Sequence, residues 1–336
     1  MESGDRHVED VETNMASPSD AAHASKWSDA QEEKKTVQWN RAHASVVCGA
    51  VAGAVSRLVI APLDVVKIRF QVQLEPLQMG TASKYTGIRQ AMKTIVKEEG
   101  IVALWRGSVP GLLLTAPYTA IQFAVMSELK EKAAFGRKPA ASFLQGAVAG
   151  VSATVGSYPF DLLRTTLAVQ GEPKVYRGMG HAAATILKRK GVQGLYSGLG
   201  PTLVEIIPYA AIQFGVYDLL CASWKKTGLK DEKLGTFMCG LGAGLVAKFC
   251  THPLDVVKKR FQVAGLERNL VYGARINEKA YRNLADCLIQ ILKKEGVGGL
   301  FKGAKPSLVK SAPAAAITFL VYESLMKAAS AKQDKE

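Results

Sequence analysis

The chain has 336 residues, and its 43 basic and 29 acidic side chains give a net charge of +14. Hydrophobic residues make up 48% of the chain and charged residues 21%, which excludes a disordered polymer, collagen and a small disulfide scaffold. A mean hydropathy of +0.06, together with several long apolar runs, indicates a protein that lies partly in lipid. The five cysteines form no Cys-x-x-Cys pair, so we expect reduced thiols.

The first part of the chain is acidic. Residues 1–35 contain nine acids and four bases, and they include no apolar stretch of the kind that forms a secretory signal. The same acidity argues against a cleaved mitochondrial presequence. We expect residues 1–40 to form a disordered acidic tail.

A threefold repeat organises the rest of the chain. The motif Pro-x-Asp-x-x-Lys/Arg begins at Pro62, Pro159 and Pro253, and an aromatic-x-Gly signature and an Ala-Ile-x-Phe segment follow each copy in the same order. Three motifs in a fixed order, repeated three times, define structural units of about a hundred residues. We expect the units to cover residues 41–135, 138–229 and 233–330.

Each unit contains two hydrophobic stretches that are long enough, at about 1.5 Å per residue, to cross a hydrocarbon core of about 30 Å. The stretches are residues 43–70, 108–130, 141–168, 199–222, 235–262 and 304–326. The segment between the two stretches is amphipathic, as shown by Ile88, Met92 and Ile95 beside Lys93 and Lys97, which is typical of a helix on a membrane surface. The sequence therefore predicts an all-α membrane protein with six transmembrane helices in three pseudo-symmetric repeats.

The basic residues are concentrated in three connections. Residues 67–106, 164–198 and 258–302 contain seven, six and ten bases, whereas the connectors 127–140 and 218–233 contain four each. By the positive-inside rule, the three basic connections face one compartment and both termini face the other.

Each proline motif places an acid and a base three residues apart within a spanning helix, where an isolated charge costs several kcal/mol. The two could pair within one helix. Threefold pseudosymmetry could instead let each acid reach a neighbouring helix and close a ring, with the prolines kinking the helices inward. A third interpretation makes these residues interfacial anchors that reach water. The threefold recurrence argues against the interfacial anchors.

The repeated Pro-x-Asp-x-x-Lys/Arg pattern and the downstream aromatic-x-Gly signature, basic at its middle position in two copies, resemble the mitochondrial carrier family over residues 43–328. The resemblance implies a monomeric six-helix barrel in the inner mitochondrial membrane, with both termini in the intermembrane space and alternating access to one central site. It also implies a matrix-side gate. Its expected ion pairs are Asp64–Arg164, Asp161–Lys258 and Asp255–Lys67, and its expected bracing glutamines are Gln71 and Gln262, whereas Ala168 stands at the third bracing position.

The cytosolic-side network that the family implies is incomplete here. The aligned acid and base positions are Ser127 and Lys130, Asp218 and Cys221, and Glu323 and Met326. Only Lys130 and Asp218 could form a bridge. We therefore predict a weak cytosolic gate and a resting preference for opening outward.

Charged residues that the gate does not need are candidates for binding a substrate. Arg57 and Lys248 stand at the same distance before the proline on the first and fifth spans. Leu114, Glu205 and Lys310 stand nine residues after the aromatic signature and resemble the family's substrate contact points. Three spare cations suit a di- or triphosphate, and an unpaired buried acid suggests a ligand that also carries positive charge or amine donors.

Thiamine pyrophosphate combines a diphosphate, a thiazolium cation and an aminopyrimidine, and strings such as residues 67–71 and 170–176 are similar to those of family members that carry it. We expect the three cations to hold the pyrophosphate, Glu205 to meet the cationic rings, and Tyr118 or Tyr209 to pack against one of them. The other expected substrate contacts are Ile206, Leu114, Gln122 and Gln213. Nucleotides or other phosphates are the expected counter-substrates.

Several alternatives remain open from the sequence. Arg57 and Lys248 could serve general anion attraction, Glu205 could pair only with Lys310, and the tyrosines could be packing residues. The same cations could bind an adenine nucleotide or coenzyme A. A basic helical-repeat protein that binds nucleic acid would fit the charge but not the six apolar spans. An enzyme or a metal site is least supported, because the five histidines form no ligand-spaced cluster and no Walker-type glycine loop occurs.

The resemblance also implies cardiolipin as a structural lipid, and no other cofactor. Its expected sites are the helix N-termini that follow Gly87 and Gly178, together with the aromatic-basic-Gly motifs. Asn283 stands where the third copy would have glycine.

Overall fold

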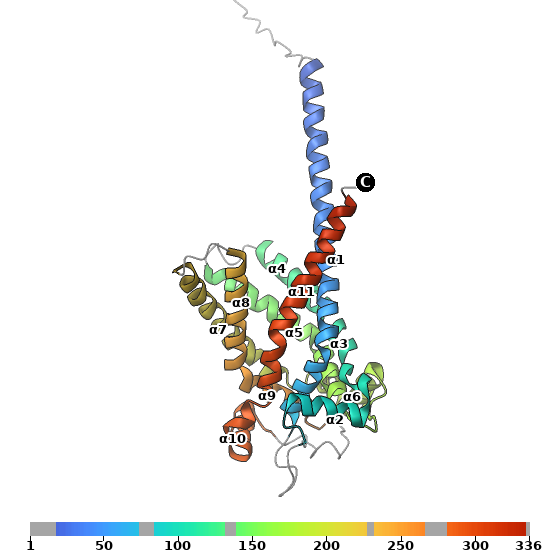
Figure 1. The fold of residues 1–336 in the computed structure, drawn as a ribbon, viewed down its shortest axis with the longest axis vertical. Coiled ribbons are helices and arrows are strands. Elements are labelled where there is room, and N and C mark those ends of the chain that lie inside the picture. Colours follow the sequence, from blue (N-terminus) through green and yellow to red (C-terminus); the bar gives the residue numbers. More distant parts are fainter. Residues whose placement is uncertain (1–17, 74–83, 132–138, 227–231, 266–280, 334–336) are drawn as a thin grey trace, which may run out of the picture. The chain divides into compact units, whose positions relative to one another are not determined.

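The computed structural model describes residues 18–73, 84–131, 139–226, 232–265 and 281–333, and in these ranges the chain forms helices and no strand (Figure 1). The all-α fold is therefore confirmed. Repeat 1 contains α1 (Pro18–Val72), α2 (Ile88–Glu99), the 3-10 helix η1 (Ile101–Trp105), α3 (Ser108–Leu113) and α4 (Thr115–Glu131). Repeat 2 contains α5 (Pro139–Val169), α6 (Met179–Gly194) and α7 (Leu199–Lys226). Repeat 3 contains α8 (Glu232–Cys250), α9 (His252–Val263), α10 (Leu284–Leu300) and α11 (Ala304–Gln333).

The chain divides into two compact units. One unit is residues 52–320, which include all the helices from α2 to α10. The described part of the other unit consists of α1 as far as Val51 and α11 from Val321. The charged residues of the three proline motifs all lie in the first unit.

The acidic head differs from the expectation. Helix α1 begins at Pro18, so residues 18–40 are helical rather than disordered. Proline is favoured at the first helical position, where its missing N–H costs nothing, and the Ala, Glu, Gln and Lys residues that follow are good helix formers. Residues 1–17 lie outside the described residues.

Four helical segments are long and apolar enough to cross a membrane: Ser45–Val72, Ile101–Leu129, Leu199–Lys226 and Ala304–Ala328. At 31 residues α5 is also long enough to span, although it is not among these four segments. The fifth expected span, residues 235–262, is two helices, because the chain breaks at Thr251 and restarts with Pro253 in the first turn of α9. The helices continue through Pro62 and Pro159 in the first two repeats.

Large apolar side chains point outward from the spanning helices. The phenylalanines of the three Ala-Ile-x-Phe segments, Phe123, Phe214 and Phe319, are 73%, 61% and 57% exposed. Exposure of a repeated aromatic side chain on three helices is unfavourable in water and ordinary in lipid. The third motif of the repeat therefore places an exposed phenylalanine on each of three apolar helices, as expected of a protein that lies in lipid.

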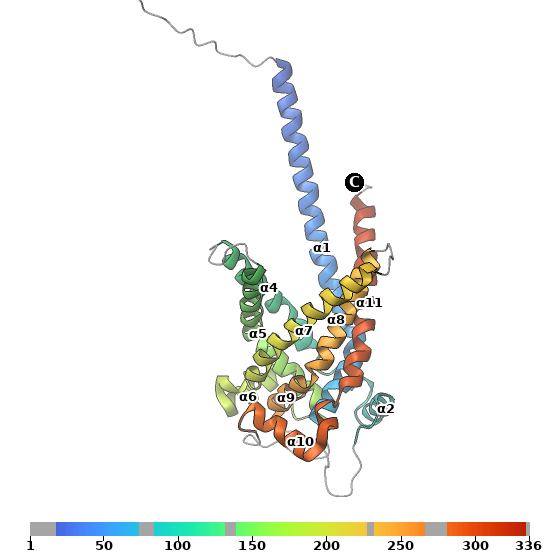
Figure 2. The same ribbon diagram turned by 90° about the vertical axis from the view of Figure 1, so that its left-hand side faces the viewer.

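The core lies where the amphipathic helices pack against the ends of α1, α5 and α9. In successive repeats Val66 packs near Ile95 of α2, Leu162 near Ile186 of α6, and Val257 near Ile291 of α10. Figures 1 and 2 show α2, α6 and α10 at the same end of the residue 52–320 unit. The polar residues of the proline motifs are thus held beside three clusters of buried apolar side chains.

Three glycines join the amphipathic segments to the next spanning helices in a left-handed conformation, with φ values of 85° at Gly107, 86° at Gly198 and 80° at Gly303. Other residue types rarely adopt this conformation. Each glycine also lies against the backbone of the next repeat. A Cβ added at these glycines would lie 2.5, 3.2 and 3.0 Å from the backbone oxygens of Arg164, Lys258 and Lys67, respectively.

Candidate functional site

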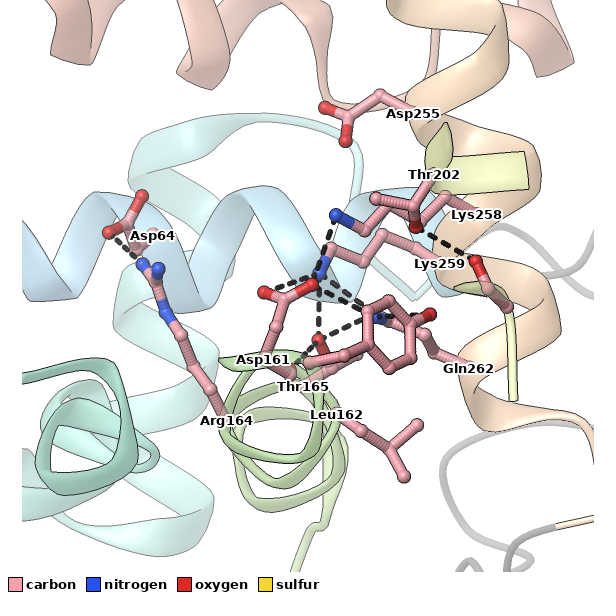
Figure 3. A network of polar contacts seen from close by, with 12 residues as sticks. Asp64, Asp161, Leu162, Arg164, Thr165, Thr202, Asp255, Lys258, Lys259 and Gln262 are labelled. Atoms are coloured by element: carbon pink, nitrogen blue, oxygen red, sulfur yellow. Dashed lines mark hydrogen bonds and ion pairs between the residues drawn. The ribbon is translucent and has the colours of Figure 1, made fainter. Parts of the chain in front are cut away.

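The acids and bases of the proline motifs pair between repeats. Lys67 Nζ lies 2.6 Å from Asp255 Oδ2, and Lys258 Nζ lies 3.0 Å from Asp161 Oδ2. The third pair joins Arg164 and Asp64 (Figure 3). Together these six residues form the ion-pair ring, which connects α1 to α5, α5 to α9 and α9 back to α1. All three ion pairs that the family resemblance implies are present.

The two expected bracing glutamines contact the ring. Gln71 Nε2 donates to Asp255 Oδ2 at 3.1 Å, and Gln262 Nε2 donates to Asp161 Oδ2 at 2.9 Å. Both glutamines are fully buried. Ala168 cannot brace with its side chain, but its backbone oxygen accepts a hydrogen bond from Arg69 Nε at 3.0 Å. Two of the three ring aspartates thus also accept a hydrogen bond from a neutral amide.

Each ring aspartate also has a second basic neighbour. Lys310 of α11 pairs with Asp64 Oδ1. Lys248 Nζ of α8 lies 3.2 Å from Asp255 Oδ2, and Lys259 Nζ of α9 lies 3.6 Å from Asp161 Oδ1. Two of these second cations, Lys248 and Lys310, are residues that the sequence assigned to the substrate.

Lys248 and Lys310, which were expected to be spare cations, therefore also contact the ring. Glu205 is not unpaired either, because its Oε1 lies 3.1 Å from Lys248 Nζ. The alternative in which Glu205 pairs with Lys310 is also wrong, since Lys310 bonds Asp64. Charges that leave water require partners, and these ionised side chains provide partners for one another.

Glu205, Lys248 and Tyr209 form one cluster between α7 and α8. Glu205 is 9% exposed, and Lys248 Nζ lies 6.0 Å from the centre of the Tyr209 ring. Glu205 and Tyr209 are four residues apart on α7, so they share one helix face. A carboxylate, an ammonium group and an aromatic ring are thus brought together, and each could contact a different part of a ligand.

Arg57 lies apart from this cluster. Its Nη1 donates to the backbone oxygen of Gly111 at 2.7 Å, and it lines one pocket together with Asp64 and Arg164. A guanidinium group has five N–H donors, so one bond to a carbonyl leaves further donors for an anion. Arg57 remains a candidate ligand residue.

The other residues expected to contact the substrate lie on the same two even-numbered spans. All five are half-buried. Leu114 lies between α3 and α4, Tyr118 and Gln122 lie on α4, and Ile206 and Gln213 lie on α7. Their half-buried side chains are compatible with contact to a ligand.

The cytosolic candidates are not brought together as a network in the described residues. Glu323 pairs within its own helix, with Lys327 Nζ at 3.1 Å. Asp218 is exposed on α7. Lys130 lies in α4, and its side chain is outside the described residues, so the Lys130–Asp218 bridge stays a prediction.

Two buried clusters on the side of the amphipathic helices were missed in the sequence. Arg69 Nη2 donates to Glu99 Oε2 at 2.8 Å, and Arg260 makes two bonds of 2.6 and 2.7 Å to the Glu295 carboxylate. The signal was available, because in both repeats an arginine follows the ring cation by two residues and a glutamate precedes the glycine of the downstream signature. Repeat 2 has Thr166 and Lys190 at these places.

These clusters also contact the neighbouring repeat. Arg106 bonds both Glu99 and Glu172, and Lys302 Nζ lies 2.7 Å from Glu295 and 3.2 Å from the backbone oxygen of Gln73. Burial alone would raise the pKa of Glu295, but the hydrogen bonds and charges of Arg260 and Lys302 outweigh burial and hold this pKa below its ordinary value. Glu295 is therefore an ionised, buried partner of two cations.

Three consecutive segments of the chain, residues 38–137, 135–227 and 230–333, match the family described as "Mitochondrial carrier protein". The chain belongs to the mitochondrial carrier family. The matched segments follow the three repeats of the fold. Members of this family are transporters, so the expectation that the chain is not an enzyme is confirmed.

Individual carriers are similar along most of this chain. It is 51% identical over 315 residues to "Mitochondrial thiamine diphosphate carrier 2" of Zea mays, with 85% of this chain and 94% of the relative covered. It is 43% identical over 287 residues to "Mitochondrial thiamine pyrophosphate carrier" of Homo sapiens, with 82% and 89% covered. A Neurospora crassa protein, "Mitochondrial thiamine pyrophosphate carrier 1", is 39% identical over 300 residues, with 83% and 89% covered.

Proposed function

We propose that this carrier moves thiamine diphosphate, also called thiamine pyrophosphate, across the inner mitochondrial membrane by alternating access. Relatives named for this substrate match more than four fifths of the chain. The ion-pair ring acts as the matrix-side gate, and the polar residues above it bind the substrate. In the described structure the ring is closed, with each acid paired to the next repeat.

The observation that carries this proposal is the excess of positive charge around the ring. Seven cations stand against four carboxylates, an excess of three. The cations are Arg57, Lys67, Arg164, Lys248, Lys258, Lys259 and Lys310, and the carboxylates are Asp64, Asp161, Glu205 and Asp255. A diphosphate, with about two to three negative charges near neutral pH, balances such an excess.

Glu205 favours a substrate that also carries positive charge. In the described structure its carboxylate is paired to Lys248 at 3.1 Å. When the diphosphate takes Lys248, Glu205 needs a new partner, because an unpaired buried carboxylate is costly. The thiazolium ring or the aminopyrimidine amine supplies this partner, and the Tyr209 ring beside Lys248 supplies a stacking surface.

Binding of the diphosphate also weakens the gate. Lys248 and Lys310 contact Asp255 and Asp64, which belong to the ring. A phosphate that draws these two lysines toward the cavity removes one of the two cations from each aspartate. The ring then opens more readily when the substrate is bound, which couples binding to access from the matrix.

The alternative, an adenine nucleotide or coenzyme A exchanger, uses the same cations but gives Glu205 no cationic ring to meet. We test the two with purified carrier in proteoliposomes, by measuring uptake of labelled thiamine diphosphate against excess unlabelled thiamine diphosphate, ADP or coenzyme A. Competition by thiamine diphosphate at the lowest concentration supports the proposal. Stronger competition by ADP or coenzyme A supports the alternative.

Glu205→Gln tests the site itself. We expect at least a tenfold loss in the apparent affinity for thiamine diphosphate, because the interaction with a cationic ring is removed. Glu98→Gln, a change at an exposed carboxylate of α2, is the matched control and leaves uptake unchanged. Unchanged uptake by the Glu205→Gln protein removes Glu205 from the site.

The remaining features of the transport cycle are part of the same proposal. A nucleotide or another phosphate leaves in exchange, the carrier acts as a monomer, and both termini face the intermembrane space, with the basic connections toward the matrix. Cardiolipin binds at the N-termini of the amphipathic helices. Gly87, Gly178 and Asn283 precede α2, α6 and α10 in extended conformations without a side-chain cap, so backbone N–H groups there are suited to a phosphate headgroup.

A further inference from the structure

Lys259 differs from the other two second cations of the ring aspartates. The side chains of Lys248 and Lys310 are each 25% exposed, whereas that of Lys259 is 8% exposed. Lys259 directly follows Lys258, and the corresponding positions in the first two repeats are occupied by Ile68 and Thr165. A cation at this position is therefore confined to the third repeat.

The partners of Lys259 lie on both sides of the α5–α9 junction. Its Nζ donates to Thr165 Oγ1 on α5 and to Gln262 Oε1 on α9, both at 2.8 Å, and it lies 3.6 Å from Asp161 Oδ1 (Figure 3). Lys258 takes the other carboxylate oxygen of Asp161. The two lysines thus divide the two oxygens of one aspartate between them.

The position of Lys259 separates it from the substrate. A diphosphate in the cavity can draw Lys248 away from Asp255 and Lys310 away from Asp64, because both lysines are partly exposed. It cannot reach a lysine that is buried between two helices. Substrate binding therefore loosens the junctions that contain Asp255 and Asp64, while Asp161 keeps both of its cations.

We propose that Lys259 is an additional gate residue, which adds contacts across the closed α5–α9 junction that the substrate does not displace. The inference rests on the proposed function, in which the ring is the matrix-side gate. Opening the junction separates Lys259 from Asp161 and Thr165 and leaves only Gln262, on its own helix, as a partner. In the empty carrier nothing offsets this loss, so the Lys259 contacts raise the barrier to opening. In the loaded carrier, substrate binding offsets the cost by loosening the junctions at Asp64 and Asp255.

The test compares leak, which is efflux without external substrate, with exchange, which is efflux stimulated by external substrate. Proteoliposomes are preloaded with labelled thiamine diphosphate, and efflux is followed with and without external thiamine diphosphate. Lys259→Ile introduces the residue that repeat 1 has at this position, Lys259→Gln removes only the charge, and Lys259→Arg keeps it. Lys305→Ile, at an exposed lysine of α11, is the matched control. Thermal unfolding in detergent shows which variants are folded.

We expect the ratio of unstimulated to stimulated efflux to rise about fivefold or more in Lys259→Ile and Lys259→Gln, corresponding to the loss of one charge-assisted hydrogen bond. The KM for thiamine diphosphate stays within about twofold of the wild-type value, since Lys259 does not touch the substrate. Lys259→Arg keeps the efflux ratio near the wild-type value, because arginine retains the positive charge. If the lysine side chain only filled space, this variant would not differ from Lys259→Gln. A wild-type ratio in folded Lys259→Gln overturns the inference, as does a tenfold rise in KM without leak.

Asp161→Asn separates this inference from the gate proposal on which it rests. If Asp161→Asn raises the leak and the Lys259 variants do not, only the role of Lys259 fails. If neither change affects the leak, the assignment of the ring as a gate fails as well. If the wild-type carrier does not exchange thiamine diphosphate, the proposed substrate fails, and the same ratios are measured with labelled ADP.

Discussion

Lys248 and Asp255 lie 3.2 Å apart, although the first was expected to bind substrate and the second belongs to the ion-pair ring. Lys248 also lies 3.1 Å from Glu205, so one ammonium group connects the Glu205 carboxylate to a carboxylate of the ion-pair ring. A ligand that moves this lysine changes both contacts at once. In the proposed function, this shared cation links the substrate site directly to the gate.

The first prediction concerns this shared cation. We expect Lys248→Gln to raise the KM for thiamine diphosphate about tenfold or more and to lower the thermal stability of the purified carrier, because two buried carboxylates lose a partner. In a Glu205→Gln background, the same change costs less stability, since only Asp255 then loses its partner. Equal stability losses in the two backgrounds would contradict the shared contact.

The second prediction concerns the glycine contact with the ring. In Gly107→Ala the residue keeps a backbone φ of 85°, and its new Cβ lies 2.5 Å from the backbone oxygen of Arg164. We therefore expect a loss of about 1–3 kcal/mol in the free energy of unfolding. Gly146→Ala, within α5 and with no atom within 4 Å of the new Cβ, is the control and leaves stability equal or higher. Thermal unfolding in detergent compares the two, and a stable Gly107→Ala protein would be inconsistent with the close approach.

The third prediction is a pH dependence at Glu295. Its folded-state pKa is lower than the ordinary value of 4.5, so the unfolded chain binds a proton more readily than the folded chain. The stability that this group contributes is therefore fully present above about pH 5 and is lost as the pH falls below the ordinary value and through the lower folded pKa.

Glu295→Gln is expected to cost about 3–5 kcal/mol at pH 7, because Arg260 and Lys302 lose their carboxylate partner, and to flatten the pH profile below pH 5. Glu98→Gln, at a carboxylate that pairs on the surface of α2, serves as control and shifts the profile little. Unfolding temperatures between pH 4 and 7 are measured for all three proteins. Parallel profiles of wild type and Glu295→Gln would rule out the linkage.

The fourth prediction ranks two arginines that share Glu99. Arg69 also donates to the backbone oxygens of Ala168 and Gln170 at 3.0 and 3.1 Å. Arg69→Gln is expected to cost about 3–5 kcal/mol, because Glu99 loses one of its two cations and the backbone oxygen of Ala168 loses its donor. Arg106→Gln is expected to cost about 1–3 kcal/mol, because Glu99 keeps Arg69 as a partner. Equal unfolding temperatures for the two variants would contradict this ranking.

The fold and the ring were predictable because they repeat. An isolated charge in a spanning helix has several possible explanations, but three acids and three bases at equal spacing favour a ring, and the family resemblance supplied the partners Arg164, Lys258 and Lys67. The unrepeated features were missed or misassigned. Lys259 has a cationic side chain in the third repeat only. The segment 18–40 forms a helix although its acidic charge suggested disorder, because it is rich in residues that favour helices.

By itself the sequence determined the threefold repeat, which residues share a helix face, and the equal spacing of the acids and bases in the three proline motifs. Tertiary structure alone decided that Lys248 joins Glu205 to Asp255, that Lys310 reaches Asp64, and that Lys259 is enclosed between α5 and α9. The reason is physical. A helix fixes the spacing of its own side chains, whereas an ion pair requires atoms within about 4 Å, and for residues as far apart in the chain as Asp64 and Lys310 only the packing of the helices sets that distance.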